Sequence, residues 1–159
     1  ENLIGNEGEG FKIALATLDG GRIGIASQAL GIAQASLNAS VAYSNERIQF
    51  GKPISKNQAI QFKITDMGME IEAARLLIRQ AAWKKDQKQN YGHLASMAKV
   101  YASEVAMRAS TQCVQIHGGF GYMRESGIER LMRDAKITQI YEGTSEIQRV
   151  VIARELLKK

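Results

Sequence analysis

The chain has 159 residues, enough for one domain with its own hydrophobic core, and it begins with Glu rather than Met, which favours a segment of a longer protein. Apolar residues make up 45% of it without a run long enough to span a membrane, and its net charge of +5 is spread along the chain. No basic block is interleaved with aromatic residues and Cys113 is the single cysteine, which argues against nucleic-acid binding, internal disulfides and cysteine-rich metal sites.

The first predicted helix follows a glycine-rich lead-in over residues 1–10 and carries apolar residues at steps of four and three. Arg22 lies on this apolar stripe, and Asp19 stands three residues before it. The two side chains either pair with each other or face a polar ligand, and the sequence leaves both possibilities open. Gly20 and Gly21 each cost a helix about 1 kcal/mol relative to Ala. They therefore indicate the close approach of another backbone or a ligand, while the helix is expected to continue through them.

Gly51 and Pro53 are expected to end this helix, because glycine is a common C-terminal stop and proline cannot continue the hydrogen-bond ladder. Ser55 with Gln58 forms a capping-box pattern, which predicts the start of a second helix. Residues 84–90 are polar and are expected to form the connection after it. The second helix has a narrow apolar seam, typical of helical bundles, at Ile60, Ile64, Met67, Ile71, Ala74, Ile78 and Ala81.

The third predicted helix begins near His93 and stops at Gly118 and Gly119. Its inner face is made of small residues, which let helix axes approach closely: Ala95, Ala98, Ala102, Val105 and Ala109. His117 has no partners at metal-ligand spacing and is interpreted as structural, and no metal site is expected in the chain.

Two shorter helices complete the prediction. Ser126 with Glu129 and Ser145 with Gln148 both show the capping-box spacing, so a helix is expected after each serine. The connections between helices are short, which favours antiparallel neighbours. The sequence therefore predicts an all-α fold, an up-and-down four-helix bundle over residues 11–159 with an additional short C-terminal helix.

Glu142 stands between an apolar segment and the start of the last helix, directly before Gly143. It is either a solvated loop acid or a buried carboxylate that burial would make a stronger proton acceptor. The helix N-terminus beside it would suit an anionic ligand. From this stretch alone, both interpretations stay open.

Residues 115–122, QIHGGFGY, hold three glycines within four residues. Such a segment lets backbone N–H groups approach a phosphate or a flat ring. No predicted strand precedes it, so a dinucleotide-binding fold of the Rossmann type is rejected.

Three stretches together resemble the C-terminal domain of the acyl-CoA dehydrogenases, and most closely the short-chain (butyryl) type. They are residues 46–54 (ERIQFGKPI), residues 115–122 with the downstream Glu125, Arg130 and Asp134, and residues 133–148 (RDAKITQIYEGTSEIQ). The match covers essentially the whole chain in order. It implies a helical bundle that follows an N-terminal helical domain and a middle β domain, with residues 1–10 as the exit from the β domain.

The resemblance also implies an activity. Members of this family use FAD to oxidise the Cα–Cβ bond of an acyl-CoA to the trans-2-enoyl-CoA, in fatty-acid or amino-acid catabolism. Glu142, in the Tyr-Glu-Gly-Thr context, matches the base that removes the α-proton while the β-hydride passes to FAD. In some relatives, such as the isovaleryl type, the base stands just before the arginine of the first helix. This chain has Gly21 there, so Glu142 has no rival.

Binding roles follow from the same resemblance. Asp19, Arg22 and Gly143 match acyl-CoA contacts. The FAD contacts comprise an arginine at the pyrophosphate, a glutamine, a loop that reaches the cofactor from a neighbouring subunit, and a segment at the adenosine–diphosphate part. In this chain they are Arg47, Gln58, Gln115, Ile116, His117, Gly118, Gly119, Thr144, Ser145 and Glu146.

The expected partners are an acyl-CoA substrate, an electron-transferring flavoprotein and further copies of the chain, as a dimer or tetramer. Neither nucleic acid nor a membrane is expected, and the expected location is a bacterial cytoplasm or a mitochondrial matrix. An acyl-CoA oxidase that uses oxygen directly, or a non-catalytic oligomerisation bundle, are the alternatives. The family's other two domains lie outside this sequence, so the segment alone is expected to bind FAD weakly or not at all and to be inactive.

Overall fold

Helices make up most of the chain in this computed structural model, which describes residues 2–158. The three long helices are α1 (Gly10–Glu46), α2 (Gln58–Asp86) and α3 (Gly92–His117). The later helices are shorter: α4 (Gly119–Tyr122), α5 (Ile128–Thr138) and α6 (Ser145–Leu156). Two 3₁₀ turns also occur, η1 (Ile54–Lys56) just before α2 and η2 (Arg124–Ser126) between α4 and α5.

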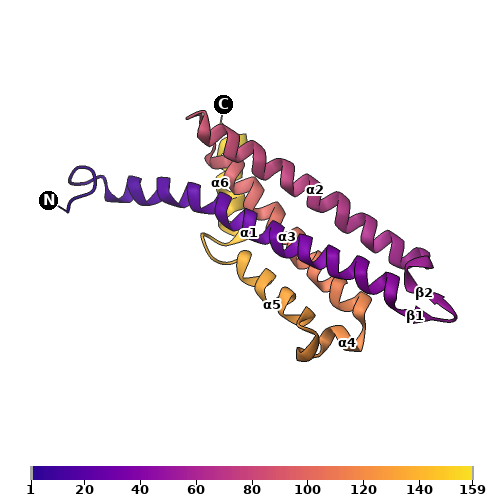
Figure 1. Ribbon diagram of the computed structural model, residues 1–159. Helices are drawn as coiled ribbons and strands as arrows, with labels where there is room; N and C mark the ends of the chain where they lie inside the picture. Colours follow the sequence, from indigo (N-terminus) through magenta and orange to yellow (C-terminus); the bar gives the residue numbers. More distant parts are fainter. Residues whose placement is uncertain (1, 159) are drawn as a thin grey trace.

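The helices α1, α2 and α3 lie side by side, and α3 packs against all of α1, α2, α5 and α6 (Figure 1). The predicted all-α fold class is confirmed. A small antiparallel ribbon of β1 (Ile48–Gln49) and β2 (Lys52–Pro53) at the α1–α2 corner was not predicted, because two-residue strands leave no alternation to detect. None of the helices within residues 2–158 is both long and apolar enough to cross a bilayer.

Small residues dominate the contact between α1 and α3. The buried positions of α1 include Ala26, Ala29, Ala33, Ser36, Ser40 and Ser44. Ser36 and Ser40 donate their hydroxyls to backbone carbonyls one turn earlier in their own helix, so they fill little space and leave no donor unpaired. All five small residues predicted for the inner face of α3 are buried, as expected. The two backbones can therefore approach closely, which is what brings the site residues of α1 and α3 together.

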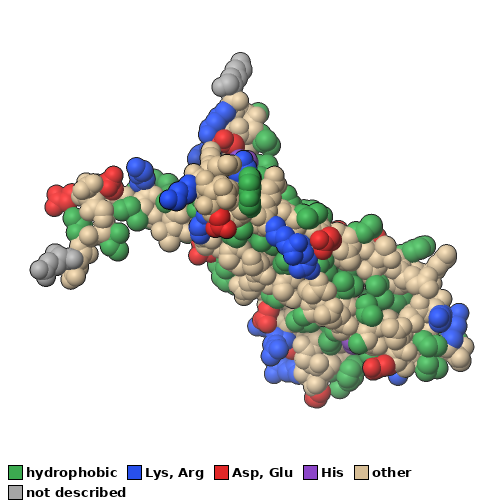
Figure 2. Space-filling view, turned by 45° about the horizontal axis from the view of Figure 1, so that its top comes forward, with side chains coloured by type: hydrophobic (Ala, Val, Ile, Leu, Met, Phe, Trp, Pro, Cys, Tyr) green, Lys and Arg blue, Asp and Glu red, His purple; other side chains and the backbone are tan. Residues whose placement is uncertain are grey.

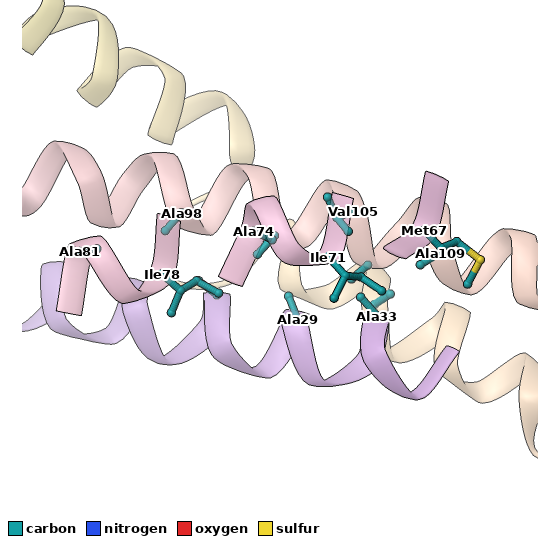
Figure 3. Packing of buried hydrophobic residues seen from close by; sticks show 14 of the residues in the cluster. Ala29, Ala33, Met67, Ile71, Ala74, Ile78, Ala81, Ala98, Val105 and Ala109 are labelled. Carbon is teal, nitrogen blue, oxygen red and sulfur yellow. The ribbon is translucent and has the colours of Figure 1, made fainter. Parts of the chain in front are cut away.

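The seam of α2 supplies the larger core side chains. Met67, Ile71 and Ile78 point from α2 towards the alanines of α1 and α3 (Figure 3). Ala74 and Ala81 of the predicted seam are fully buried, whereas Ile60 and Ile64 at its start are partly buried against the core. Bulky residues on one helix thus fill the space left by small residues on the other two.

The N-terminal part of α1 projects from the bundle as an arm (Figures 1 and 2). The apolar stripe predicted for this helix is therefore exposed at its start, where Phe11 is 78% exposed. Farther along, Gly20 and Gly21 do not interrupt the helix, as predicted.

The predicted capping boxes are wrong in detail. Asn57, not Ser55, precedes α2, because Ser55 lies in the turn η1. Gly127 precedes α5, although the Ser126 hydroxyl still accepts the N–H of Ile128 at 3.2 Å. Thr144 caps α6, accepting the Ile147 N–H at 3.4 Å, and Ser145 is the first helical residue. A spacing rule does not distinguish neighbouring hydroxyl residues, so the helices were located but their caps were not.

Candidate functional site

The turn that carries Glu142 has an unusual backbone. Glu142 has φ 55° and Gly143 has φ 91°, so two successive residues leave the right-handed region. This conformation costs a non-glycine residue roughly 1–2 kcal/mol, so surrounding contacts must hold it. Glycine is required at Gly143 for two reasons: its positive φ is unfavourable for other residues, and a Cβ there would lie 2.6 Å from Gln148 Nε2.

The carboxylate of Glu142 lies directly on the backbone of α1 at Gly21. A Cβ at Gly21 would stand 2.5 Å from Glu142 Oε2 and 2.8 Å from its Cδ, closer than real carbon atoms approach. The close approach expected at Gly21 is therefore made by a side chain, neither another backbone nor a ligand. Oε2 is buried and has no hydrogen-bond partner within the described part of the chain, so a lone pair is free.

Arg22 and Asp19 pair with each other beside this carboxylate. Arg22 Nη1 donates to Asp19 Oδ1 at 2.7 Å and to Ser96 Oγ on α3 at 3.4 Å, and the guanidinium is buried. The pairing alternative is thus confirmed, but the Asp19 side chain remains about one-third exposed. Arg22 Nε is buried without a partner among residues 2–158, so the pair retains one donor that a ligand could use.

Lys99 is a site residue that the sequence patterns did not single out. Its side chain is 0% exposed, and Nζ donates to the Gly143 carbonyl at 2.7 Å. Burial, and after it the positive charge of Arg22, lower the pKa of Lys99 to about 8, against the partly opposing effects of Glu146 and Glu142. A detectable signal was present: Lys99 follows Ala95 by four residues and precedes Ala102 by three, which places it on the buried face of α3.

A second group of predicted residues lies at the other end of the bundle. Arg47 lines a hollow of about 560 Å³ together with Ile116, His117, Gly118 and Gly119. Tyr43 contributes a flat aromatic wall, its ring stacked on that of His117 with 4.3 Å between centroids. His117 Nδ1 lies 2.8 Å from the Cys113 carbonyl oxygen, an acceptor, so this nitrogen carries a proton and the ring is held in place. The remaining predicted residues of this end, Gln58 and Gln115, are exposed and do not line the hollow.

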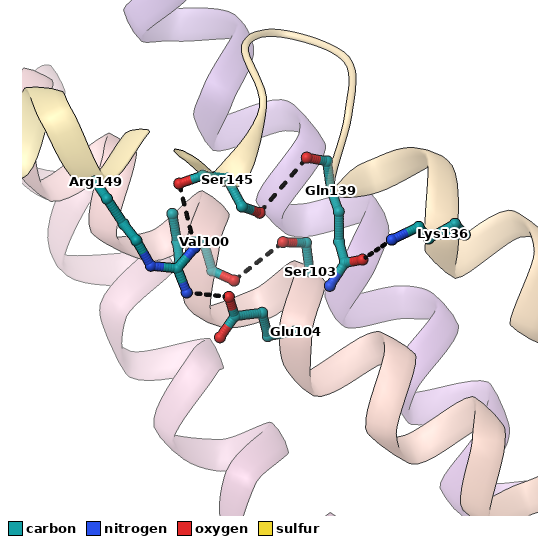
Figure 4. Close-up of polar contacts among 7 residues, drawn as sticks. All are labelled: Val100, Ser103, Glu104, Lys136, Gln139, Ser145 and Arg149. Atoms are coloured by element: carbon teal, nitrogen blue, oxygen red, sulfur yellow. Dashed lines mark hydrogen bonds and ion pairs between the residues drawn. The ribbon is translucent and has the colours of Figure 1, made fainter. Parts of the chain in front are cut away.

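Thr144, Ser145 and Glu146 instead lie near Glu142, around a small cavity of about 150 Å³ at the start of α6. Figure 4 shows Arg149 bridging the Ser145 carbonyl and the Glu104 carboxylate, and Ser145 bonded to the Gln139 carbonyl. Hydrogen bonds from its own backbone N–H and from Thr144 hold the pKa of Glu146 below its usual range. This helix start is suited to an anionic group, although the acidic residue already occupies part of it.

The two groups are far apart. Gly21 contacts Glu142, whereas Arg47 directly follows α1, so about 39 Å of uninterrupted helix separates them at 1.5 Å per residue. One dinucleotide cannot bridge that distance. The predicted cofactor residues are thus brought together in two sets, not one.

Known proteins match the chain over nearly its whole length. Residues 8–157 match the family model described as acyl-CoA dehydrogenase, C-terminal domain. The mitochondrial short-chain specific acyl-CoA dehydrogenase of Rattus norvegicus is 58% identical over 99% of this chain and 38% of its own length.

Two solved structures have the same fold over 99% of this chain, each with a TM-score of 0.98 and 57% identity. One is butyryl-CoA dehydrogenase from Megasphaera elsdenii, of which 41% is covered. The other is a chain, 42% covered, in the structure of the electron transferring flavoprotein of Acidaminococcus fermentans. The chain spans about two fifths of the length of these relatives.

The buried lysine gives a testable pH dependence of stability. Between pH 8 and 10.5, unfolded Lys99 holds a proton that the folded protein has released. The unfolded state then binds more protons, so the free energy of unfolding rises with pH, by up to about 1.4 kcal/mol per pH unit. Urea unfolding between pH 7.5 and 9.5 should show this rise, measured as the difference between wild type and Lys99→Met. Equal pH slopes in the two proteins would contradict the lowered pKa.

Proposed function

This chain belongs to the acyl-CoA dehydrogenase family, and we propose that it is the base-bearing part of an enzyme that oxidises the Cα–Cβ bond of a short-chain acyl-CoA to the trans-2-enoyl-CoA. The observation that carries the proposal is the Glu142 carboxylate, which lies on Gly21 with Oε2 free. A carboxylate that is fixed in place but makes no hydrogen bond is suited to accept a proton. The short-chain preference is taken from the names of the relatives.

The proposed reaction removes two hydrogens. Glu142 Oε2 takes the α-proton, and the electron pair of the broken Cα–H bond forms the new double bond as the β-hydride leaves. When bound, FAD supplies the hydride acceptor, which no side chain can provide. Gly143, which lacks a side chain, leaves room for the thioester beside the base. Arg22 and Asp19, which form a partly exposed pair, would meet the more polar part of the substrate.

The residues at the far end of the bundle fit part of FAD. Arg47 is exposed and forms no ion pair with any residue from 2 to 158, so its guanidinium is free for a pyrophosphate. Gly118 and Gly119 expose their backbone, and the Tyr43–His117 stack offers a flat surface. Thr144–Glu146 would contact the FAD of their own chain's site.

Homo-oligomerisation follows from the separation of the two sets, because a complete FAD site would need the Arg47 end of one chain and the Glu142 end of another. A second observation supports it. Four large apolar residues, each more than half exposed, repeat every seven residues along α2: Phe62, Met69, Leu76 and Trp83. A heptad spacing is the pattern by which helices pair in coiled coils, so a second copy of α2 is the occupant we propose.

An electron-transferring flavoprotein is the proposed electron acceptor, which agrees with the solved structure that contains a similar chain. Hydrogen peroxide release by the full-length protein, without need of such an acceptor, would instead indicate an oxidase. The relatives include bacterial and mitochondrial enzymes. We therefore propose the bacterial cytoplasm or the mitochondrial matrix as the location of the protein. Because the segment holds the base but only part of the proposed cofactor contacts, it should be inactive alone.

Replacing the base tests the proposed function directly. In full-length protein, Glu142→Gln should lower kcat for butyryl-CoA by roughly 10²–10⁴-fold, since general-base catalysis contributes that much. Bound FAD, followed by its visible absorbance, should be unchanged. Unaltered turnover would refute the assignment and would favour a bundle that serves only in oligomerisation.

The contact at Gly21 offers a matched pair of substitutions in one helix. Gly21→Ala should displace the Glu142 carboxylate and lower kcat by about 10²-fold, as expected for a shift of about 1 Å in a reacting group. Gly24→Ala meets nothing within 4 Å and should keep full activity, with helix stability raised by about 1 kcal/mol. Steady-state kinetics would compare kcat of the two variants. Equal kcat values would contradict the role of Gly21 in placing the Glu142 carboxylate.

Subunit complementation tests the shared site. Arg47→Ala and Glu142→Gln should each be inactive alone, because every site then lacks one of the two residues. In oligomers assembled from both variants, one kind of site receives Glu142 from one chain and Arg47 from the other. Random pairing should therefore restore about one quarter of the wild-type activity. No recovery in verified mixed oligomers would contradict a site that two chains share.

A further inference from the structure

Two buried side chains hold the carbonyl groups of the Glu142–Gly143 turn. Lys99, on α3, donates from Nζ to the Gly143 oxygen at 2.7 Å. Gln148, on α6, donates from Nε2 to the oxygens of Glu142 and Gly143, both at 3.1 Å. Each of the two side chains is 0% exposed. Three hydrogen bonds from two different helices therefore converge on two neighbouring peptide groups.

This arrangement counteracts a local tendency of the backbone. Glu142 and Gly143 both have positive φ, and for Glu142 the right-handed region would be lower in energy. Rotation of either peptide group would turn its carbonyl away from Lys99 and Gln148 and would swing the Glu142 side chain off Gly21. The hydrogen bonds thus select the one backbone conformation in which the carboxylate lies against α1.

A lysine is a costly choice for this position. Burying an ammonium is unfavourable unless it is well bonded, and a methionine of similar length would fill the same space. In the part of the chain that the structure describes, the Gly143 oxygen is the one hydrogen-bond acceptor that Nζ reaches. The benefit that offsets burial is therefore a charge-assisted hydrogen bond to this turn. The pKa of Lys99, about 8, leaves the ammonium charged at neutral pH.

We propose that Lys99 is the positioning residue for the proton transfer, holding the Glu142–Gly143 turn, together with Gln148, so that the Glu142 carboxylate stays in place on Gly21. The inference rests on the proposed function, because it needs Glu142 to be the base. Lys99 bonds the backbone of the turn, so it acts through Glu142 and not on the substrate. Its loss should slow the proton transfer without removing the binding site.

The test uses full-length enzyme with Lys99→Met. Bound FAD and the KM for butyryl-CoA should remain within about threefold of wild type, while kcat falls about 10–100-fold through misplacement of the base. With butyryl-CoA deuterated at the α-carbon, the kinetic isotope effect on kcat should increase, because proton removal becomes rate-limiting. A purely structural role would not change the isotope effect.

Lys63→Met is the matched control. Lys63 is also a partly buried lysine on a bundle helix, and it bonds Gln112 on α3, away from the base. This variant should keep the wild-type kcat and isotope effect. Wild-type kcat and isotope effect in Lys99→Met would overturn the inference while leaving Glu142 as the base, whereas normal turnover of Glu142→Gln would refute the proposed function itself.

Gln148→Met decides the matter if Lys99→Met loses FAD or fails to fold. It removes two of the three hydrogen bonds without leaving a buried charge, and Gln148 Oε1 is already unpartnered within residues 2–158, so the substitution should be tolerated. The expected result is again a lower kcat with retained KM and a larger isotope effect. Unchanged kinetics in Gln148→Met would contradict the role assigned to the turn.

Discussion

The close packing of α1 on α3 is the constraint on which the rest of the structure depends. Alanines and serines along the shared face bring the two backbones together. That proximity places Arg22 beside Ser96 and lets the α5–α6 turn lie against both helices at once. Larger side chains at these positions would separate the helices, and Glu142 would then lose either Gly21 or the support from Lys99.

The site combines an unpaired carboxylate oxygen with buried side chains that make hydrogen bonds around it, although Arg22 Nε and Gln148 Oε1 also lack partners among residues 2–158. Arg22, Lys99 and Gln148 are buried and engaged in hydrogen bonds, whereas Glu142 Oε2 is buried and has no partner among the described residues. An unpaired buried oxygen is normally unfavourable. Its presence within a rigid frame is understandable if the missing partner is a substrate hydrogen, which is why the carboxylate, and not the larger hollows of the bundle, carries the proposed chemistry.

Much of the fold could be predicted from local patterns. The seams of α2 and α3 repeat regularly, and glycines mark the end of α3, so these helices follow from the sequence. The site was only partly predictable. Glu142 and the glycine opposite it emerged through resemblance to a family, but the contact of Gly21 with Glu142 joins distant parts of the chain and has no local signature. The spacing along α3 could have shown that Lys99 is buried, but not its role, since its acceptor lies 44 residues later. The β1–β2 ribbon was not predicted and the helix caps were wrongly assigned, because each of these features depends on only one or two residues.

The unbroken length of α1 has a consequence for how the chain can vary. Each inserted or deleted residue within the helix would rotate its far half by roughly 100° and shift it by about 1.5 Å. Even a seven-residue insertion, which nearly restores the facing, would move Arg47 by about 10 Å. In the proposed two-chain site, the length of α1 therefore sets the distance between the base of one subunit, held at Gly21, and the cofactor of its neighbour, which Arg47 would contact.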